Sequence, residues 1–248
     1  MRVVAVPCLK DNYAYLVIDA GRAAVVDPGE AAPIEAALVR EGVTLGAIWA
    51  THHHHDHVGG IQALVAAHPG IEVVASVVDA PKVPYVTRAV KDNDVVAFGA
   101  LRATIIHNPA HTLGGITFFV EGCAFTGDTL FGAGCGRLFE GDAAMMHASL
   151  SRLATLPPET RVYFGHEYTA SNLRFAAAVE PDNTAVARRA SELTTPSTPS
   201  TMADELATNP FLRSTEPSVI AAARAHGAND ETAISVFAAI RGWKDSFK

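Results

Sequence analysis

The chain has 248 residues, 49% of them apolar and 18% charged, so it is long enough for one large domain or two smaller ones. Its formal net charge is −7, and neither its first two-thirds nor its last third has the basic excess of a nucleic-acid-binding surface. No apolar run approaches the ~18 residues of a membrane span, and the N-terminal stretch is too short for a signal-peptide core. A cytoplasmic protein is therefore expected, with neither a membrane nor a nucleic acid as partner. Three widely spaced cysteines indicate neither a disulfide framework nor a zinc finger.

Short apolar runs alternate with turn signals along the first two-thirds of the chain. Apolar residues have helical spacing at 33–41 and at 61–68. Strands and helices alternate too irregularly for a doubly wound sheet, so two sheets covered by helices are predicted. The predicted strands are Val3–Val6, Tyr15–Ile18, Ala23–Val26, Ala47–Ala50, Val73–Ala75, Leu101–Ile106, Ile116–Val120, Cys123–Thr126 and Val162–Phe164.

The most informative segment is Thr51-His52-His53-His54-His55-Asp56-His57, between the strand at 47–50 and the helix at 61–68. Imidazole and carboxylate groups bind first-row divalent metals in hydrolytic sites. Loops between regular elements often carry function, and neighbouring loop residues can face two different metals. A surface histidine run or a purification tag is the competing interpretation, but tags lie at chain ends. The segment therefore predicts a metal site in a loop.

The last third of the chain differs in character from the first two. It is rich in alanine, and four of its segments have helical periodicity. A low-complexity stretch at 194–201, rich in Thr, Ser and Pro, cannot be helical throughout. A small, mostly helical C-terminal domain beginning near 166–170 is predicted. The predicted helices are Thr169–Glu180, Thr184–Leu193, Pro217–His226 and Asp230–Trp243.

Three further candidate ligands follow apolar strands. They are His111, Asp128 in Thr126-Gly127-Asp128, and His166 in Phe164-Gly165-His166. A lone His or Asp at a strand end is more often a hydrogen-bonded structural residue. Together with the histidine segment, however, these residues supply enough ligands for two tetrahedral-like metal sites with a shared carboxylate.

The combined pattern resembles the metallo-β-lactamase superfamily of binuclear hydrolases, and within it the glyoxalase II, or hydroxyacylglutathione hydrolase, family. The resemblance implies an α+β fold, with a four-layer αββα sandwich over residues 1–166 and a small helical, glutathione-binding domain over 167–248. It also implies two divalent metal ions, most simply zinc, with iron or manganese as the other candidates. His53 and His55 would not be ligands. The implied ligands are His52, His54 and His111 for the first metal, Asp56, His57 and His166 for the second, and Asp128 as a bridge.

Three other segments resemble glyoxalase II in particular. The first is Asp11-Asn12-Tyr13, which otherwise would be an ordinary strand start. The second is the Gly134-Cys135-Gly136-Arg137 loop, which does not match a nucleotide-binding glycine pattern. The third is the C-terminal pair Arg241 and Lys244, three residues apart on one helix face, which could also be a simple helix-end charge pair. Phe139 replaces a tyrosine found in some relatives. The resemblance implies that the substrate contacts Arg137, Phe139, Tyr168, Arg241 and Lys244.

The implied reaction is hydrolysis of S-D-lactoylglutathione to D-lactate and glutathione, the second step of methylglyoxal detoxification. Two metals would lower the pKa of a bound water to ~7, so that a bridging hydroxide is available at neutral pH. Asp56 and Asp128 would be the catalytic side chains that act with this hydroxide. A thiolate leaving group needs no strong general acid, because a thiol pKa is near ~8.5. A monomer is expected.

Other activities remain open at this level, because this scaffold supports several hydrolases. A lactonase or β-lactamase is the first alternative, although the basic C-terminal pair counts against it. A glutathione persulfide dioxygenase would use one iron, whereas seven ligands favour two metals. The acidic balance disfavours a nuclease. A non-catalytic metal-binding or redox module is the alternative from another class, but no flavin domain fits in 248 residues.

Overall fold

The computed structural model describes residues 1–247 and contains two six-stranded sheets. The first sheet has its strands in chain order; β1 to β3 are antiparallel, and β3 to β6 are parallel. In the second sheet the order is β14-β13-β10-β9-β8-β7. The first-sheet strands are β1 (Arg2–Cys8), β2 (Asn12–Asp19), β3 (Arg22–Val26), β4 (Thr44–Trp49), β5 (Glu72–Ser76) and β6 (Arg88–Val90). The second-sheet strands are β7 (Val95–Phe98), β8 (Leu101–His107), β9 (Ile116–Val120), β10 (Cys123–Gly127), β13 (Arg161–Phe164) and β14 (Ser200–Thr201).

Successive side chains of a strand point to opposite faces of its sheet. The two sheets pack face to face because the side chains on their facing sides are apolar. In β2, Tyr13, Tyr15 and Val17 enter the core between the sheets, whereas Leu16 and Ile18 pack on the outer face. At the centre of the inner core, the ring of Trp49 stacks on that of Phe118 at 5.0 Å. A strand whose two faces are both buried gives no polar alternation, which is why β2 is an almost continuous apolar run.

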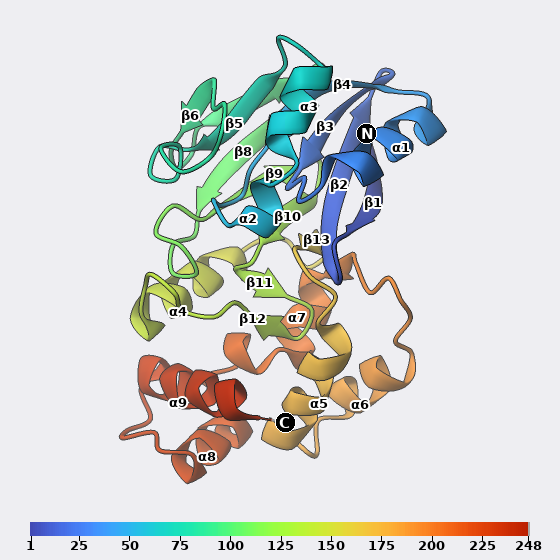
Figure 1. The fold of residues 1–248 in the computed structure, drawn as a ribbon. Helices are drawn as coiled ribbons and strands as arrows, with labels where there is room; N and C mark the ends of the chain where they lie inside the picture. Colours follow the sequence, from blue (N-terminus) through green and yellow to red (C-terminus); the bar gives the residue numbers. More distant parts are fainter. Residues whose placement is uncertain (248) are drawn as a thin grey trace.

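Helices cover both outer faces and complete a four-layer αββα arrangement, which confirms the predicted fold class (Figure 1). α1 (Ala31–Glu41) and α3 (Ile61–Ala67) pack on the outer face of the first sheet. α4 (Ala143–Leu153) packs against the second sheet together with the C-terminal helices. The remaining helices of the first part and the C-terminal part are α2 (His55–Val58), α5 (Thr169–Val179), α6 (Thr184–Ser191), α7 (Met202–Thr208), the 3-10 helix η1 (Pro210–Leu212), α8 (Pro217–Ala225) and α9 (Ala233–Ser246).

The C-terminal helices lie below one end of the sandwich, and the small sheet of β11 (Leu130–Phe131) and β12 (Gly134–Cys135) lies at the boundary (Figure 1). A single apolar cluster runs from this small sheet through α4 into the helices, and it includes Phe175, Phe211 and Phe237. The helical part is therefore attached through a continuous core. Among the described residues, no helix is long and apolar enough to cross a membrane.

Several elements differ from the sequence-based prediction. The histidine segment was predicted as a loop, but only its first half is one, because α2 begins at His55. Helices α4 and α7 and strands β6 and β7 were not predicted. Asp142 caps the start of helix α4, and its carboxylate accepts a hydrogen bond from the amide of Met145. The helix was not predicted because it follows a glycine-rich loop. The stretch 194–201 was predicted not to be helical throughout, and it contains no helix.

Candidate metal centre

The carboxyl ends of several strands meet at the edge of the sandwich that faces the helices (Figure 1). The segment after β4 carries His52, the loop after β8 carries His111, and β10 and β13 are followed by Asp128 and His166. Strands β8, β10 and β13 run in the same direction, so their carboxyl ends share one edge. Sheet topology therefore gathers residues that lie more than 100 positions apart in the chain.

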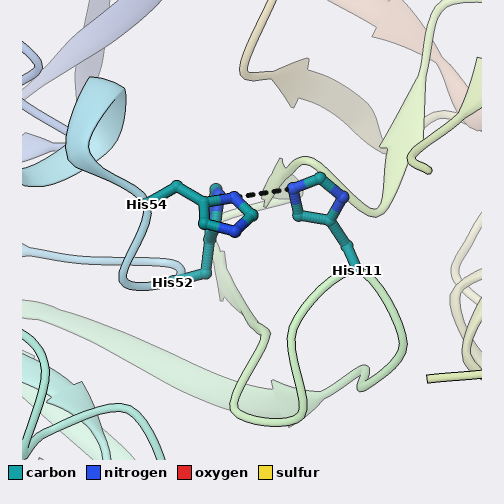
Figure 2. Close-up of side chains that lie close together, drawn as sticks. All are labelled: His52, His54 and His111. Carbon is teal, nitrogen blue, oxygen red and sulfur yellow. Dashed lines mark hydrogen bonds between the residues drawn. The ribbon is translucent and has the colours of Figure 1, made fainter. Parts of the chain in front are cut away.

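Three histidines form a first group in which the rings converge. His54 Nδ1 lies 3.1 Å from His52 Nε2 and 3.0 Å from His111 Nε2. Figure 2 shows His111 approaching from its own loop, opposite the segment that carries His52 and His54. A proton can bridge one such nitrogen pair, but three converging imidazole nitrogens match the donor set of a first-row divalent metal.

A second group combines Asp56 and His57 of α2 with His166. Asp56 Oδ2 lies 3.6 Å from His57 Nε2 and 3.3 Å from His166 Nε2. His54 is the N-cap of α2, and successive side chains at a helix turn point in directions about 100° apart. This turn lets His54 face the first group while Asp56 and His57 face the second.

Asp128 lies between the two groups. Its Oδ2 atom is 3.4 Å from His111 Nε2 and 3.3 Å from His166 Nε2, and its Oδ1 atom is 3.3 Å from His57 Nε2. Such closeness leaves no room for a side chain at Gly165, where a Cβ would overlap the Asp128 carboxylate. A glycine before His166 is thus required by the packing at this position, which the sequence alone could not show.

The outer nitrogen of four histidines is held by a specific partner. His52 Nδ1 lies 3.0 Å from Thr51 Oγ1, and His57 Nδ1 lies 3.0 Å from Asp27 Oδ2. His111 Nδ1 lies 2.9 Å from the carbonyl oxygen of Arg137, and His166 Nδ1 lies 2.8 Å from Asp11 Oδ1. Such partners fix the tautomer and the ring orientation of metal-binding histidines.

The histidines of the first group stay neutral at pH 7. Burial, followed by the neighbouring His57, holds the pKa of His52 well below its ordinary value. Burial also lowers the pKa of His54 and His111. Each ring therefore keeps a free lone pair, which metal binding requires.

The second group is dominated by carboxylates. Burial opposes the charging of His57, but Asp128 and Asp27 outweigh it and raise its pKa to about 10. Burial opposes the charging of His166 as well, but Asp128 and Asp56 raise its pKa to about 11. A hydrogen bond with His166 also holds the pKa of Asp56 below its ordinary value, against the effect of burial. The negative charge of these carboxylates therefore favours a positive charge beside them, either a proton on His57 or His166 or a bound metal cation.

The residues fit a pair of divalent metals. His57 Nε2 and Asp128 Oδ1 are buried and have no hydrogen-bond partner within residues 1–247. Unpartnered buried polar atoms are costly, and a shared cation would satisfy both. Imidazole and carboxylate donors together suit zinc, iron or manganese.

Asp27, Asp11 and Asn12 are site residues whose contacts sequence reasoning missed. Asp27 was interpreted only as part of a turn, yet it also accepts hydrogen bonds from the amide and hydroxyl of Thr51. Its positive φ of 50°, which only the structure reveals, is a strain that at a non-glycine residue often marks a functional position. Asn12 donates to Asp56 Oδ2 at 2.9 Å.

His53 and His55 do not enter either group. His53 Nδ1 lies 3.0 Å from Asp79 Oδ2, and its Nε2 atom lies 3.6 Å from Glu140. His55 is exposed at the start of α2. Although His53, Asp79 and Glu140 lie close enough to share a metal, Lys82 Nζ is 2.8 Å from Glu140 and already compensates its charge.

A cleft of about 650 Å³ opens over the metal centre and reaches the C-terminal helices. Its walls combine predicted ligands with all five predicted substrate-binding residues. The lining residues that bear on this point are His54, Asp56, His111, Asp128, His166, Arg137, Phe139, Tyr168, Arg241 and Lys244.

The two basic residues of α9 have different environments. Arg241 is buried, and its guanidinium donates to the carbonyl of Cys135 at 3.1 Å and to Asp245 at 2.9 Å. Lys244 is half-buried, and burial followed by Arg241 lowers its pKa. Lys244 thus lies beside another cation, whereas Arg241 is paired with Asp245 and also fixes the loop that precedes Arg137.

Two aromatic residues border the cleft. Phe139 is 62% exposed, and its ring lies beside those of His54 and His111 at 5.6 Å and 5.2 Å. The ring of Tyr168 stacks on His166 at 4.8 Å. Burial, followed by Asp11, raises the pKa of Tyr168 to about 12, so its hydroxyl stays protonated and can donate a hydrogen bond. By contrast, Cys135 is a buried thiol whose pKa burial raises, which does not suit a nucleophile.

Comparison with known families divides the chain into two matched stretches. Residues 10–166 match the model of the metallo-beta-lactamase superfamily. Residues 167–247 match the model described as the hydroxyacylglutathione hydrolase C-terminus.

Similar proteins agree with these models. A hydroxyacylglutathione hydrolase of Gloeobacter violaceus is 50% identical over 259 residues and covers 100% of both chains. One from Alkalilimnicola ehrlichii is 48% identical over 254 residues, with 98% of each chain covered. Among solved structures, the BLEG-1 B3 metallo-beta-lactamase has a TM-score of 0.68 at 23% identity and covers 85% of this chain and 99% of its own, which shows the fold alone. The di-iron-bound form of TTHA1623 has a TM-score of 0.58 at 32% identity and covers 67% of this chain and 92% of its own.

Proposed function

This chain belongs to the hydroxyacylglutathione hydrolase family within the metallo-β-lactamase superfamily, and we propose that it hydrolyses S-D-lactoylglutathione to D-lactate and glutathione. The observation that carries the proposal is a single cleft that joins the metal centre to cationic side chains of the C-terminal part. A thioester that reacts at one end and carries peptide carboxylates at the other fits this arrangement.

We propose that two divalent cations bind here, the first at His52, His54 and His111, the second at Asp56, His57 and His166, with Asp128 contacting both. When bound, they would supply a water nucleophile at neutral pH and polarise the thioester carbonyl. The neutral imidazoles of the first group and the unpartnered atoms His57 Nε2 and Asp128 Oδ1 support this assignment.

In this proposal Asp56 orients the attacking water. Its Oδ2 atom accepts a hydrogen bond from Asn12, so the carboxylate is fixed, and its half-exposed side chain borders the cleft. A fixed acceptor lowers the entropic cost of aligning the nucleophile. The leaving thiolate needs no strong acid because its conjugate thiol has a pKa near ~8.5.

Glutathione binding falls to the cationic wall. Lys244 is half-buried near Arg241 and Arg137, and its pKa is lowered first by burial and then by repulsion from these cations. A carboxylate bound there would relieve the repulsion, so anionic ligands are favoured. The hydroxyl of Tyr168 can donate to the peptide part, whereas Phe139 offers only an apolar face.

The finer points of the proposal are the metal, the assembly and the location. We propose zinc, which suits mixed imidazole and carboxylate donors, with iron or manganese as alternatives. The proposed metal ligands and substrate contacts come together within a single chain, so the site needs no residue of a second copy, and we propose a functional monomer. Three free, buried thiols support a reducing, cytoplasmic setting.

The two family models meet between residues 166 and 167. This boundary supports a catalytic domain at 1–166 and a substrate-binding domain at 167–248.

The deciding experiment follows thioester absorbance of S-D-lactoylglutathione while metal content is measured on the same sample. We expect turnover with about two metals per chain, loss of activity on chelation and recovery with zinc. Two bound metals without thioester turnover would overturn the proposal and direct tests to lactones and β-lactams. One iron together with oxygen consumption would instead indicate a dioxygenase.

A further inference from the structure

In the Asp11-Asn12-Tyr13 segment at the start of β2, the first two side chains contact the second metal group, and the third contacts the residue next to it. Asp11 Oδ1 accepts a hydrogen bond from His166 Nδ1 at 2.8 Å. Asn12 Nδ2 donates to the carboxylate of Asp56 at 2.9 Å and to its main-chain oxygen at 3.2 Å. The hydroxyl of Tyr13 donates to Glu167, the residue after His166, at 2.7 Å.

The backbone joins the same two segments. The amide of Tyr13 donates to the carbonyl of Gly165, and the amide of Glu167 donates to the carbonyl of Asp11, both at 2.8 Å. An isolated antiparallel bridge pairs Asn12 with His166. The side chain of Glu167 also accepts hydrogen bonds from the amide and hydroxyl of Ser197. The low-complexity stretch therefore belongs to the same hydrogen-bond network.

These contacts determine which donor atoms face inward. With Nδ1 of His166 held by Asp11, its Nε2 atom points to Asp56 and Asp128, each at 3.3 Å. With Oδ2 of Asp56 held by Asn12, this carboxylate cannot rotate freely into the open cleft. The same side chains make no hydrogen bond to His52, His54 or His111 within residues 1–247.

We infer that Asp11 and Asn12 are positioning residues for the second metal group alone, and that their loss weakens metal binding there while the first group keeps its affinity. The inference rests on the proposed binuclear site. It gives the D-N-Y segment a physical role, since outer partners of metal ligands typically account for ~10- to 100-fold in metal affinity.

The test is zinc titration of the metal-free full chain against a competing chelator, with Asp11→Ala, Asn12→Ala and the conservative Asp11→Asn. We expect one of the two zinc ions to bind about 10- to 100-fold more weakly in the alanine variants, and Asp11→Asn to recover part of the loss because it keeps an acceptor. Glu30→Ala is the matched control. Glu30 holds the same β1–β2 turn through the amide of Leu9 at 2.6 Å but makes no hydrogen bond to a predicted ligand. Thermal unfolding of the metal-free variants checks the fold.

Two backgrounds assign the weakened ion. In a His54→Ala chain the remaining zinc binds the second group, and adding Asp11→Ala should weaken it. In a His57→Ala chain the remaining zinc binds the first group, and Asp11→Ala should leave it unchanged. Equal weakening in both backgrounds, no weakening in either, or the same effect from Glu30→Ala would overturn the inference. Because the readout is metal affinity, selective weakening in a chain that fails to hydrolyse lactoylglutathione would retain the inference and refute only the proposed substrate.

Discussion

Carboxylates are paired with positive charge in different ways in the helical part and in the metal centre. Glu180 is 4% exposed and pairs with Arg213 at 2.7 Å, and the fully buried Glu205 pairs with Arg189 at 2.7 Å. Within residues 1–247, the ion pairs of Asp56 and Asp128 involve histidines alone. The helical part carries its own permanent positive charge, whereas the centre has positive charge only from protons or from bound cations.

The type of partner distinguishes a structural carboxylate from a functional one. An arginine keeps its charge at any working pH, so its pair is stable and chemically silent. An imidazole can release its proton, so a cluster of carboxylates and histidines can exchange protons for metal ions.

Replacement of Asp128 should break the metal centre most severely. Asp128→Asn removes the charge that both groups share, and kcat/KM for lactoylglutathione should fall well beyond the ~10- to 100-fold typical of an outer partner. Steady-state kinetics with metal analysis on the same sample would measure this. Glu159→Asn is the control at an exposed carboxylate, and comparable losses in both variants would contradict a special role for Asp128.

Asp27 should link the two groups, in contrast to Asp11. Asp27 contacts His57 directly, and it contacts Thr51, whose hydroxyl lies beside His52. Asp27→Ala should therefore weaken both metals by ~10- to 100-fold in a competitive zinc titration. If Asp27→Ala weakened the binding of only one zinc ion, Asp27 would support one metal group and not both.

The cationic wall should affect substrate binding and not the chemistry. The double variant Arg241→Ala, Lys244→Ala should raise KM for glutathione thioesters about 10- to 100-fold, since a hydrogen bond to a charged group contributes ~1.5–3 kcal/mol. A short neutral thioester should be affected far less. Arg188→Ala, an exposed cation outside the cleft, is the control, and equal losses on both substrates would refute the binding role.

The pair of Glu180 and Arg213 should stabilise the fold in a pH-dependent way. Burial raises the pKa of Glu180, but hydrogen bonds from Arg213 and Ser218 outweigh it and hold the pKa below its ordinary value. A carboxyl group of this kind stabilises the folded state above its unfolded pKa of ~4.3, and the stabilisation is lost as pH falls through the lowered folded value.

Glu180→Gln should accordingly reduce the free energy of unfolding by ~1–3 kcal/mol at pH 7 and by progressively less below about pH 4. Urea denaturation at a series of pH values would measure the difference. The exposed pair of Arg224 and Glu231 offers a comparison, because Glu231→Gln should change stability little at any pH. A constant difference for Glu180→Gln down to pH 2 would contradict the assigned cause.

The local pattern of apolar and polar residues was sufficient to predict many of the strands and helices. The strand at 116–120 was predicted with its observed bounds, and the helix predicted at 169–180 is observed at Thr169–Val179. Helix α4 was missed because its apolar residues follow a glycine-rich loop, and strands β6 and β7 were missed because they are short and half-exposed. Such elements form where tertiary contacts favour them, and their own sequence gives little warning.

The sequence by itself determined the chemistry of the centre, because residue type decides which atoms can bind a metal, and the spacing of His52, His54, Asp56 and His57 concentrates those atoms in six positions. Only the tertiary structure decided which residues orient them. Asp11 meets His166 across 155 positions, and Asn12 meets Asp56 across 44. Such pairs exist because β2 is antiparallel to β3 and β3 is parallel to β4, so β2 begins at the edge where β4 ends. The order and register of strands depend on the burial of apolar faces throughout the chain.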